Sequence, residues 1–207
     1  MEKVAIFIDG ANFSATANVL GFSIDYEKLL NYFSSQYRVV RSYFYTATLS
    51  LPDGSINRRT QIEWLSHHGY TPRHKPSKQF EERHYCPNCS VSFTKYKVKG
   101  NMDMEMAVDI IRTAPLVDRI ILFTGDGDFR SLLQYVQEDR GVQVTVVSTR
   151  KASVLSEDLR RQADQFIDLE LIRDAISRFP NNRAPVIVER KPVKSLIGLI
   201  GRKRAGE

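Results

Sequence analysis

Apolar stretches without polar alternation recur along the chain and are separated by stretches with helical spacing. Such continuous apolar runs are typical of strands that helices cover on both faces of a parallel sheet. They predict strands at residues 3–8, 39–47, 120–123, 142–148 and 166–169. Helices are predicted at 23–36, 56–68, 102–112 and 153–163, after residue 128, and from the last strand to about 179. Because strands alternate with helices, we expect an α/β fold with right-handed connections and a mainly parallel central sheet.

Two segments interrupt this alternation. Residues 70–99 are irregular and contain basic residues, prolines, the unit Cys86-Pro87-Asn88-Cys89 and an alternating pattern that ends at Lys99. We interpret this segment as an insertion that contains a hairpin. After residue 179, prolines and charges replace the apolar periodicity, which predicts a basic, flexible tail over 180–207. The expected organisation is one domain over 1–179, with the insertion at about 70–99, followed by the tail.

The net charge of +6 is concentrated in the tail. From residue 175 onward there are eight basic and two acidic side chains, so the charges of the preceding residues balance. Basic segments can hold the phosphate backbone of a nucleic acid, and tail charges can also serve solubility alone. No apolar run approaches the roughly 20 residues of a membrane span, and the beginning of the chain is unlike a secretory signal. We therefore expect a cytoplasmic protein without a membrane partner.

Aspartates stand at the predicted carboxyl ends of two strands and at the start of one helix. Asp9 follows the first strand, Asp126 and Asp128 follow the strand at 120–123, and Asp103 begins the helix at 102–112. The carboxyl ends of parallel strands share one edge of the sheet, where ligands bind, so these acids can converge there. Asp109 lies about 120° around the helix from Asp103 at 100° per residue, so it need not face the same site.

Crowded carboxylates repel one another unless a cation neutralises them. Hard oxygen ligands suit Mg²⁺ or Mn²⁺, which activate water and stabilise charge on a phosphoryl group. Asp9, Asp103, Asp126 and Asp128 are therefore the candidate metal-binding and catalytic residues. Structural roles compete with this interpretation: Asp9 could be a turn residue, and Asp103 and Asp126 could cap helices. Asn12 could cap the helix after the first strand.

Three segments of the chain resemble the signature segments of the NYN domain, LabA-like group, in the PIN-like nuclease superfamily. They are Ile6–Asn12, Lys99–Asp103 with Ala107–Asp109, and Thr124–Phe129. The resemblance extends over about residues 3–170. It implies a PIN-like three-layer α/β/α fold and divalent-metal-dependent cleavage of RNA. Asn101 and Met102 replace the small residues that are usual after Lys-Gly in this group.

The resemblance also implies roles for individual residues. It assigns metal binding to Asp9, Asp103 and Asp126, with Asp128 as a fourth acid. It further implies that Asn12 is a polar helper and that Lys99 contacts a phosphate. Three more basic residues are candidates for substrate binding: Arg130, Lys95 and Lys97.

Three functions are weighed on these grounds. The first is a metal-dependent ribonuclease, acting endonucleolytically on single-stranded RNA. The second is an RNA-binding or regulatory protein that keeps the acidic pocket without turnover. The third, a small-molecule phosphohydrolase, accounts poorly for the basic insertion and tail, and the first strand is not followed by an Asp-x-Asp unit.

The two cysteines of the insertion have the spacing of a zinc knuckle. A closed zinc site needs four ligands, which His84 and His74 could complete beside Cys86 and Cys89. Alternatively, two chains of a homodimer share the site, or the cysteines are a free or redox-active thiol pair. Aromatic residues lie among the basic ones here and could stack on the bases of single-stranded nucleic acid or pack the insertion onto the core. They are Phe80, Tyr85, Phe93 and Tyr96.

Overall fold

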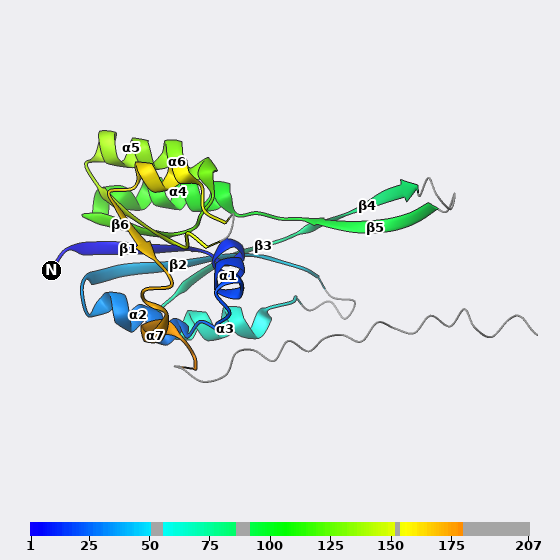
Figure 1. Ribbon diagram of the computed structural model, residues 1–207, viewed down its shortest axis with the longest axis horizontal. Coiled ribbons are helices and arrows are strands. Elements are labelled where there is room, and N and C mark those ends of the chain that lie inside the picture. The colour runs from blue at the N-terminus through cyan, green and yellow to red at the C-terminus, as the bar shows by residue number, and fades with distance from the viewer. Residues whose placement is uncertain (51–55, 86–91, 152–153, 180–207) are drawn as a thin grey trace, which may run out of the picture.

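The computed structural model describes residues 1–50, 56–85, 92–151 and 154–179, with the backbone alone for 79–85 and 92–99. At its centre is a six-stranded sheet in the order β3-β2-β1-β6-β7-β8, in which every neighbouring pair is parallel (Figure 1). The strands are β1 (Lys3–Asp9), β2 (Arg38–Thr48), β3 (Thr71–Pro76), β6 (Arg119–Phe123), β7 (Gln143–Ser148) and β8 (Gln165–Asp168). The strand order reverses between β1 and β6. Open parallel sheets bind ligands at the carboxyl ends of their strands at such a point.

Helices cover both faces of the sheet, which confirms the predicted α/β/α layers (Figure 1). One layer contains α1 (Gly10–Val19), α2 (Tyr26–Ser34), α3 (Arg59–His67) and α7 (Arg173–Ile176). The other contains α4 (Asp103–Thr113), α5 (Arg130–Arg140) and α6 (Glu157–Gln162). In the described ranges, no helix combines the length and the apolar character that crossing a membrane requires.

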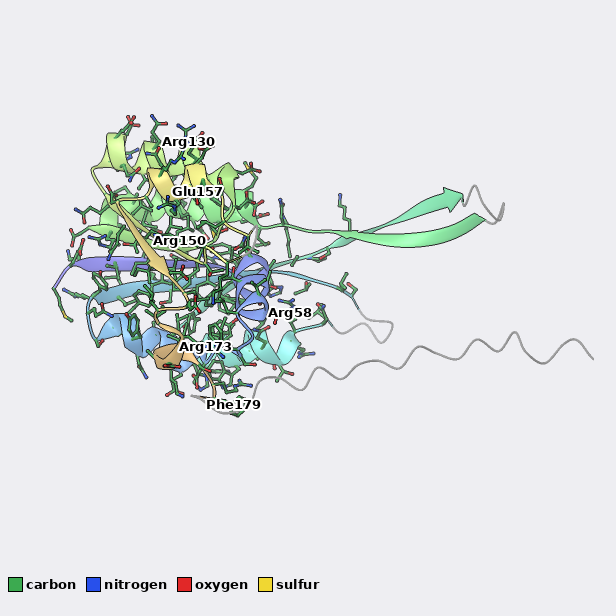
Figure 2. The ribbon with its side chains drawn as sticks, viewed as in Figure 1. Arg58, Arg130, Arg150, Glu157, Arg173 and Phe179 are labelled. Atoms are coloured by element: carbon green, nitrogen blue, oxygen red, sulfur yellow. The ribbon has the colours of Figure 1, made fainter. Side chains whose placement is uncertain are left out.

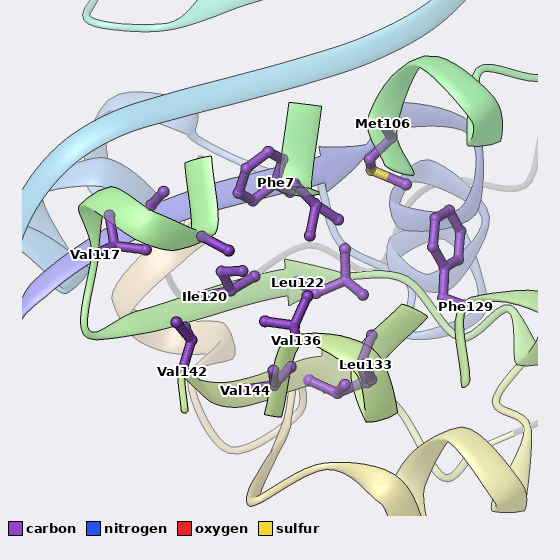
Figure 3. Close-up of a cluster of buried hydrophobic side chains, with 14 of the residues drawn as sticks. Phe7, Met106, Val117, Ile120, Leu122, Phe129, Leu133, Val136, Val142 and Val144 are labelled. Atoms are coloured by element: carbon purple, nitrogen blue, oxygen red, sulfur yellow. The ribbon is translucent and has the colours of Figure 1, made fainter. Parts of the chain in front are cut away.

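The two faces of β1 belong to two hydrophobic cores, because side chains alternate along a strand. Phe7 faces the layer of α4 and α5, and Figure 3 shows it among the apolar side chains of that core. Ile8 faces the layer of α1 and α2. There, the ring of Phe13 on α1 meets the ring of Phe123 on β6 edge-on, with centroids 4.9 Å apart. This packing holds the carboxyl ends of β1 and β6 against the start of α1.

The predicted insertion at 70–99 is too long, because its first residues belong to the central sheet. Thr71–Pro76 form the edge strand β3, parallel to β2. Pro72 and Pro76 weaken the strand pattern in the sequence, but an edge strand tolerates proline since one of its sides needs no partner. The hairpin is present: β4 (Lys78–Tyr85) and β5 (Ser92–Lys99) pair antiparallel and extend away from the domain (Figure 1).

Three predicted helices, α2, α3 and α6, begin later than their apolar spacing suggests, and two of them start at a capping side chain. α2 starts at Tyr26, where the side chain of Asp25 accepts hydrogen bonds from the backbone N–H groups of Glu27 and Lys28. α6 starts only at Glu157. In both cases the capping side chain fixes the beginning of the helix, since it satisfies N–H groups that have no partner within the helix.

Candidate active site

Asp9 ends β1 and caps α1. Its Oδ1 accepts hydrogen bonds from the backbone N–H groups of Ala11 and Asn12, each at 3.1 Å, and its Oδ2 accepts one from the hydroxyl of Thr124 at 3.3 Å. Burial raises the pKa of Asp9, the three hydrogen bonds oppose that rise, and the charge of Asp126 adds to it. The carboxylate is therefore held at the junction of β1, α1 and the turn after β6.

Asn12 does not cap α1, contrary to the prediction, because α1 begins at Gly10 and Asp9 is the cap. The Oδ1 of Asn12 instead accepts a hydrogen bond from the backbone N–H of Gly125, at 3.0 Å. This bond joins the first turn of α1 to the turn after β6. Asn12 thus positions the two segments that carry Asp9 and Asp126.

The turn after β6 places Asp126 and Asp128 beside the end of β1. The Oδ1 of Asp126 accepts a hydrogen bond from the backbone N–H of Asp128 at 3.0 Å and so caps the 3₁₀ turn η2 (Gly127–Phe129), as its alternative interpretation predicted. Asp126 is half-buried and Asp128 is exposed. A Cβ atom on Gly125 would lie 1.8 Å from the carbonyl oxygen of Val154, so only glycine fits this turn.

Asp103 is the first residue of α4 and does not cap it, since the helix has Met102 at its N-cap and no side-chain cap bond. Its Oδ2 accepts a hydrogen bond from the side-chain amide of Asn101 at 2.6 Å. Burial raises the pKa of Asp103 to about 6, and the charges of three acids add to the rise: Asp9, Asp126 and Asp128. The structure therefore brings all four predicted acids into one electrostatic neighbourhood.

Lys75 on β3 is a cation at this site that the sequence interpretation missed. Its charge lowers the pKa of Asp103, and its Nζ donates a hydrogen bond to Oε1 of Glu105 on α4 at 2.7 Å. The side chain of Lys75 is 39% exposed. In the sequence, Lys75 is one of several basic residues of the segment 70–99, and its neighbours in the chain do not distinguish it from the others. Only the pairing of β3 with β2 places it near the acids.

Asp109 has a different environment from the other four acids. Its Oδ2 accepts hydrogen bonds from the hydroxyl of Tyr45 at 3.0 Å and from Nε of Arg73 at 3.2 Å. Tyr45 is buried on β2, and burial next to Asp109 raises the pKa of the Tyr45 hydroxyl well above its usual value. Asp109 joins α4 to β2 and β3, and it is not among the charges that raise the pKa of Asp103.

The donor atoms of the acidic site suit a hard divalent cation, because all of them are carboxylate oxygens. The mutual repulsion that raises the pKa of Asp103 is also the electrostatic strain that a cation would remove. Within the described residues, however, no three His, Cys, Asp or Glu side chains are close enough together to hold one ion. The four acids are gathered at the edge of the sheet, at a wider spacing than a coordination sphere.

The predicted basic residues lie on the hairpin and on α5. Lys99 ends β5 opposite Lys78, and Lys95 and Lys97 occupy alternate positions farther along the same strand. Gly100, which follows Lys99, packs closely against the residue between β3 and β4, since a Cβ atom there would lie 2.7 Å from Oγ of Ser77. Arg130 is the exposed first residue of α5, and Figure 2 shows it in the layer of α5 and α6.

The predicted zinc ligands are divided between two parts of the structure. His74 is exposed on β3, opposite Thr46. Tyr85, the last residue of β4, is separated from it by the length of that strand, about 25 Å at roughly 3.3 Å per residue. Cys86 and Cys89 lie outside the described residues. The structure therefore does not test whether His74 shares a site with these cysteines, and zinc binding by the knuckle stays a prediction.

Comparison with known proteins identifies the family of the chain. A family model described as "NYN domain" matches residues 3–170. The chain is similar to the low amplitude and bright protein LabA of Synechococcus elongatus, with 32% identity over 192 residues, which cover 90% of this chain and 96% of that protein. It is also similar to the crystal structure of VPA0982, a protein of unknown function from Vibrio parahaemolyticus. That match has a TM-score of 0.64 and 27% identity and covers 85% of this chain and 96% of the other. The chain belongs to the NYN domain family.

Proposed function

We propose that this protein is a divalent-metal-dependent ribonuclease that cuts single-stranded RNA endonucleolytically. NYN domains belong to the PIN-like nuclease superfamily and are generally nucleases. For this chain, the proposal is carried by the gathering of Asp9, Asp103, Asp126 and Asp128 at the point where the strand order reverses. Four like charges in one place oppose folding unless they serve a bound cation, so a structural role alone does not account for them.

Asp9, Asp103 and Asp126 would hold the cation, Mg²⁺ or Mn²⁺, by moving closer together around it, with Asp128 at the exposed rim. When bound, the ion supplies an activated water and neutralises charge that develops on the phosphoryl group. The protein's part is to position the carboxylates. The backbone of α1 orients Asp9, and the bond from Gly125 to Asn12 keeps the turn that carries Asp126 against it.

Basic residues on the β3 side of the acids would hold the RNA backbone. Lys75 lies beside Asp103, and Lys99 stands four residues before that acid, at the base of the hairpin. Lys95 and Lys97 continue this series along β5. Lysine ammonium groups neutralise phosphates regardless of sequence, so they position a strand without reading its bases. A flexible single strand can follow such a series into the acidic site.

A second function is supported by one observation. The acids are spaced more widely than a coordination sphere in the described residues, which favours a protein that binds RNA and does not cut it. In that case the basic residues would perform the same task, and the acidic site would be a regulatory metal site.

The test is an assay of the full chain with end-labelled single-stranded RNA, in Mn²⁺, in Mg²⁺ and in chelator. The variant is Asp126→Asn, and the matched control is Asp139→Asn, at an exposed aspartate near the end of α5. We expect internal cleavage that requires the metal, is lost in Asp126→Asn and is retained in Asp139→Asn.

Other outcomes would reject the ribonuclease proposal. Cleavage that persists in Asp126→Asn, or in chelator, would show that the acids do not carry the activity. RNA that is bound but remains intact with either metal would establish the second function. Turnover confined to small phosphate esters would indicate a phosphohydrolase.

A further inference from the structure

One face of α4 is apolar and exposed. Met104 is 73% exposed, Val108 is 48% exposed and Ile111 is 39% exposed. At about 100° per residue, these three side chains fall within a sector of about 60°. Leu116, 69% exposed, lies on the 3₁₀ turn η1 (Ala114–Leu116) that directly follows the helix. We call these four residues the α4 stripe.

The α4 stripe is unusual because it lies opposite a face of the helix that is already buried. Met106 and Ile110, which are each 1% exposed, pack into the core against the sheet. Single exposed apolar residues are ordinary on protein surfaces, but a contiguous group indicates an interaction site. Of the nine large hydrophobic side chains exposed in the described residues, four belong to the stripe. A helix that is apolar on two opposite faces is typical of one that is covered on both.

We propose that the α4 stripe is the interface of a homodimer, in which α4 of one copy packs antiparallel against α4 of the second. The two-fold axis passes near Val108. An isologous contact uses the same patch twice, so one helical stripe is enough to form it. In this arrangement the N-terminus of each helix lies beside the C-terminus of the other, so the two helix dipoles attract each other.

The charges beside the stripe select this antiparallel arrangement. Glu105 near the start of α4 and Arg112 near its end lie on the same flank, about 20° apart around the axis at 100° per residue. A two-fold axis near Val108 exchanges positions 105 and 112, so each Glu105 faces Arg112 of the second copy. Lys75 holds Glu105 in place at 2.7 Å, and Arg112 forms no ion pair within the described residues. In a parallel arrangement the same flank of the two copies would lie on opposite sides of the interface, so Glu105 would not face Arg112 of the second copy.

A second copy suits the stripe better than the chain's own tail does. The described chain ends at Phe179, which Figure 2 shows beside the layer of α7, on the opposite face of the sheet from α4. The apolar run at 195–200 is flanked by the basic residues Lys194 and Arg202, which would add positive charge beside Arg112.

The test compares the mass of the full chain in solution with the masses of two variants. Sedimentation velocity and light scattering would be run over a range of micromolar concentrations. Val108→Asp places a charge at the centre of the interface. Leu171→Asp is the matched control, because Leu171 is 83% exposed and lies before α7. We expect the wild type and Leu171→Asp to approach twice the chain mass of 23.7 kDa, and Val108→Asp to remain at that mass. Circular dichroism checks that each variant is folded.

A cross-linking variant tests the register without a destabilising charge. Under mild oxidation, Val108→Cys is expected to form a disulfide between the two introduced thiols of a dimer, identified by peptide mass mapping. Val19→Cys, at a residue of α1 with a similar exposure of 46%, should not form one. The proposal is overturned by a wild type that stays monomeric, by a dimer that survives Val108→Asp, or by a disulfide that joins position 108 only to Cys86 or Cys89.

Discussion

Asp103 and Asp109 belong to the same helix, but their electrostatic environments are opposite. Asp103 faces three other carboxylates, and its pKa rises to about 6. Asp109 accepts hydrogen bonds from Arg73 and the buried Tyr45, so its charge is compensated within the protein. The first environment stores repulsion that a cation would relieve, and the second joins the helix to the sheet. The comparison teaches that the partners of a carboxylate separate a functional role from a structural one where residue type cannot.

The largest expected difference concerns activity. Asp103→Asn should lower the rate of RNA cleavage by on the order of 100-fold or more, because it removes a charge that would act on the cation. Asp109→Asn should change the rate severalfold at most at a temperature where it is folded. Both are measured with the same labelled RNA under single-turnover conditions. A comparable loss in both variants would remove the functional distinction between the two acids.

The free energy of unfolding, in contrast, should fall more when Asp109 is replaced than when Asp103 is replaced. Asp109→Ala leaves the buried hydroxyl of Tyr45 without its acceptor, which costs about 1 to 3 kcal/mol. Tyr45→Phe removes the same hydrogen bond but leaves no unsatisfied hydroxyl, so it should cost less. Chemical denaturation of each variant measures these differences. If Asp109→Ala were as stable as the wild type, the proposed role of this acid in joining α4 to the sheet would be wrong.

Binding should depend on Lys75 through its charge. Lys75→Met is expected to weaken the binding of single-stranded RNA several-fold and to reduce the slope of log affinity against log salt concentration by about 0.7. Lys3→Met is the control, since Lys3 starts β1 at the opposite edge of the sheet. Fluorescence anisotropy in chelator, over a series of salt concentrations, measures both slopes. Equal slopes for the two variants would exclude a phosphate contact at Lys75.

The smallest expected effect is the pH dependence of stability. The pKa of Asp103 is raised to about 6 in the folded protein from 3.8. Between these values the folded state binds more protons than the unfolded state, so this group lowers stability as pH rises from about 4 to 6. Without metal, Asp103→Asn should therefore be more stable than the wild type at pH 8, by on the order of 1 kcal/mol after allowance for solvent screening, and similar to it at pH 4. Thermal melts at the two pH values measure this; an equal difference at both would contradict it.

Much of the site could be predicted because its signals are local. Asp9 directly follows an apolar run typical of a buried strand, and Asp126 follows a second such run after Thr124 and Gly125. Parallel strands bring their carboxyl ends together. Asp103 could be placed at a helix start, although the alternative role of helix cap is excluded by Met102 at the N-cap. Its meeting with the other acids depends on where α4 crosses the sheet, which no short window of sequence contains.

The strand β3 and the role of Asn12 were misassigned from the sequence for the same physical reason, which is that both depend on tertiary packing. β3 has prolines and charges because it is an edge strand, so it lacks the apolar run by which the other strands are recognised. Asparagine is a common N-cap residue, but the side chain of Asp9 already accepts hydrogen bonds from the free N–H groups at the start of α1. The amide oxygen of Asn12 instead accepts a hydrogen bond from the N–H of Gly125. In both cases the local sequence is compatible with either structure, and tertiary packing determines which one forms.

The sequence by itself determined the alternation of strands and helices, the α/β class and the positions of the acids at strand and helix ends. These features follow from period, burial and backbone chemistry within a few residues. Only the tertiary structure decided that Lys75 stands beside Asp103, that Asp109 is compensated by Tyr45 and Arg73, and that the α4 stripe is left exposed. Each of these depends on contacts between segments distant in the chain, where the same residue types would be equally acceptable in other arrangements.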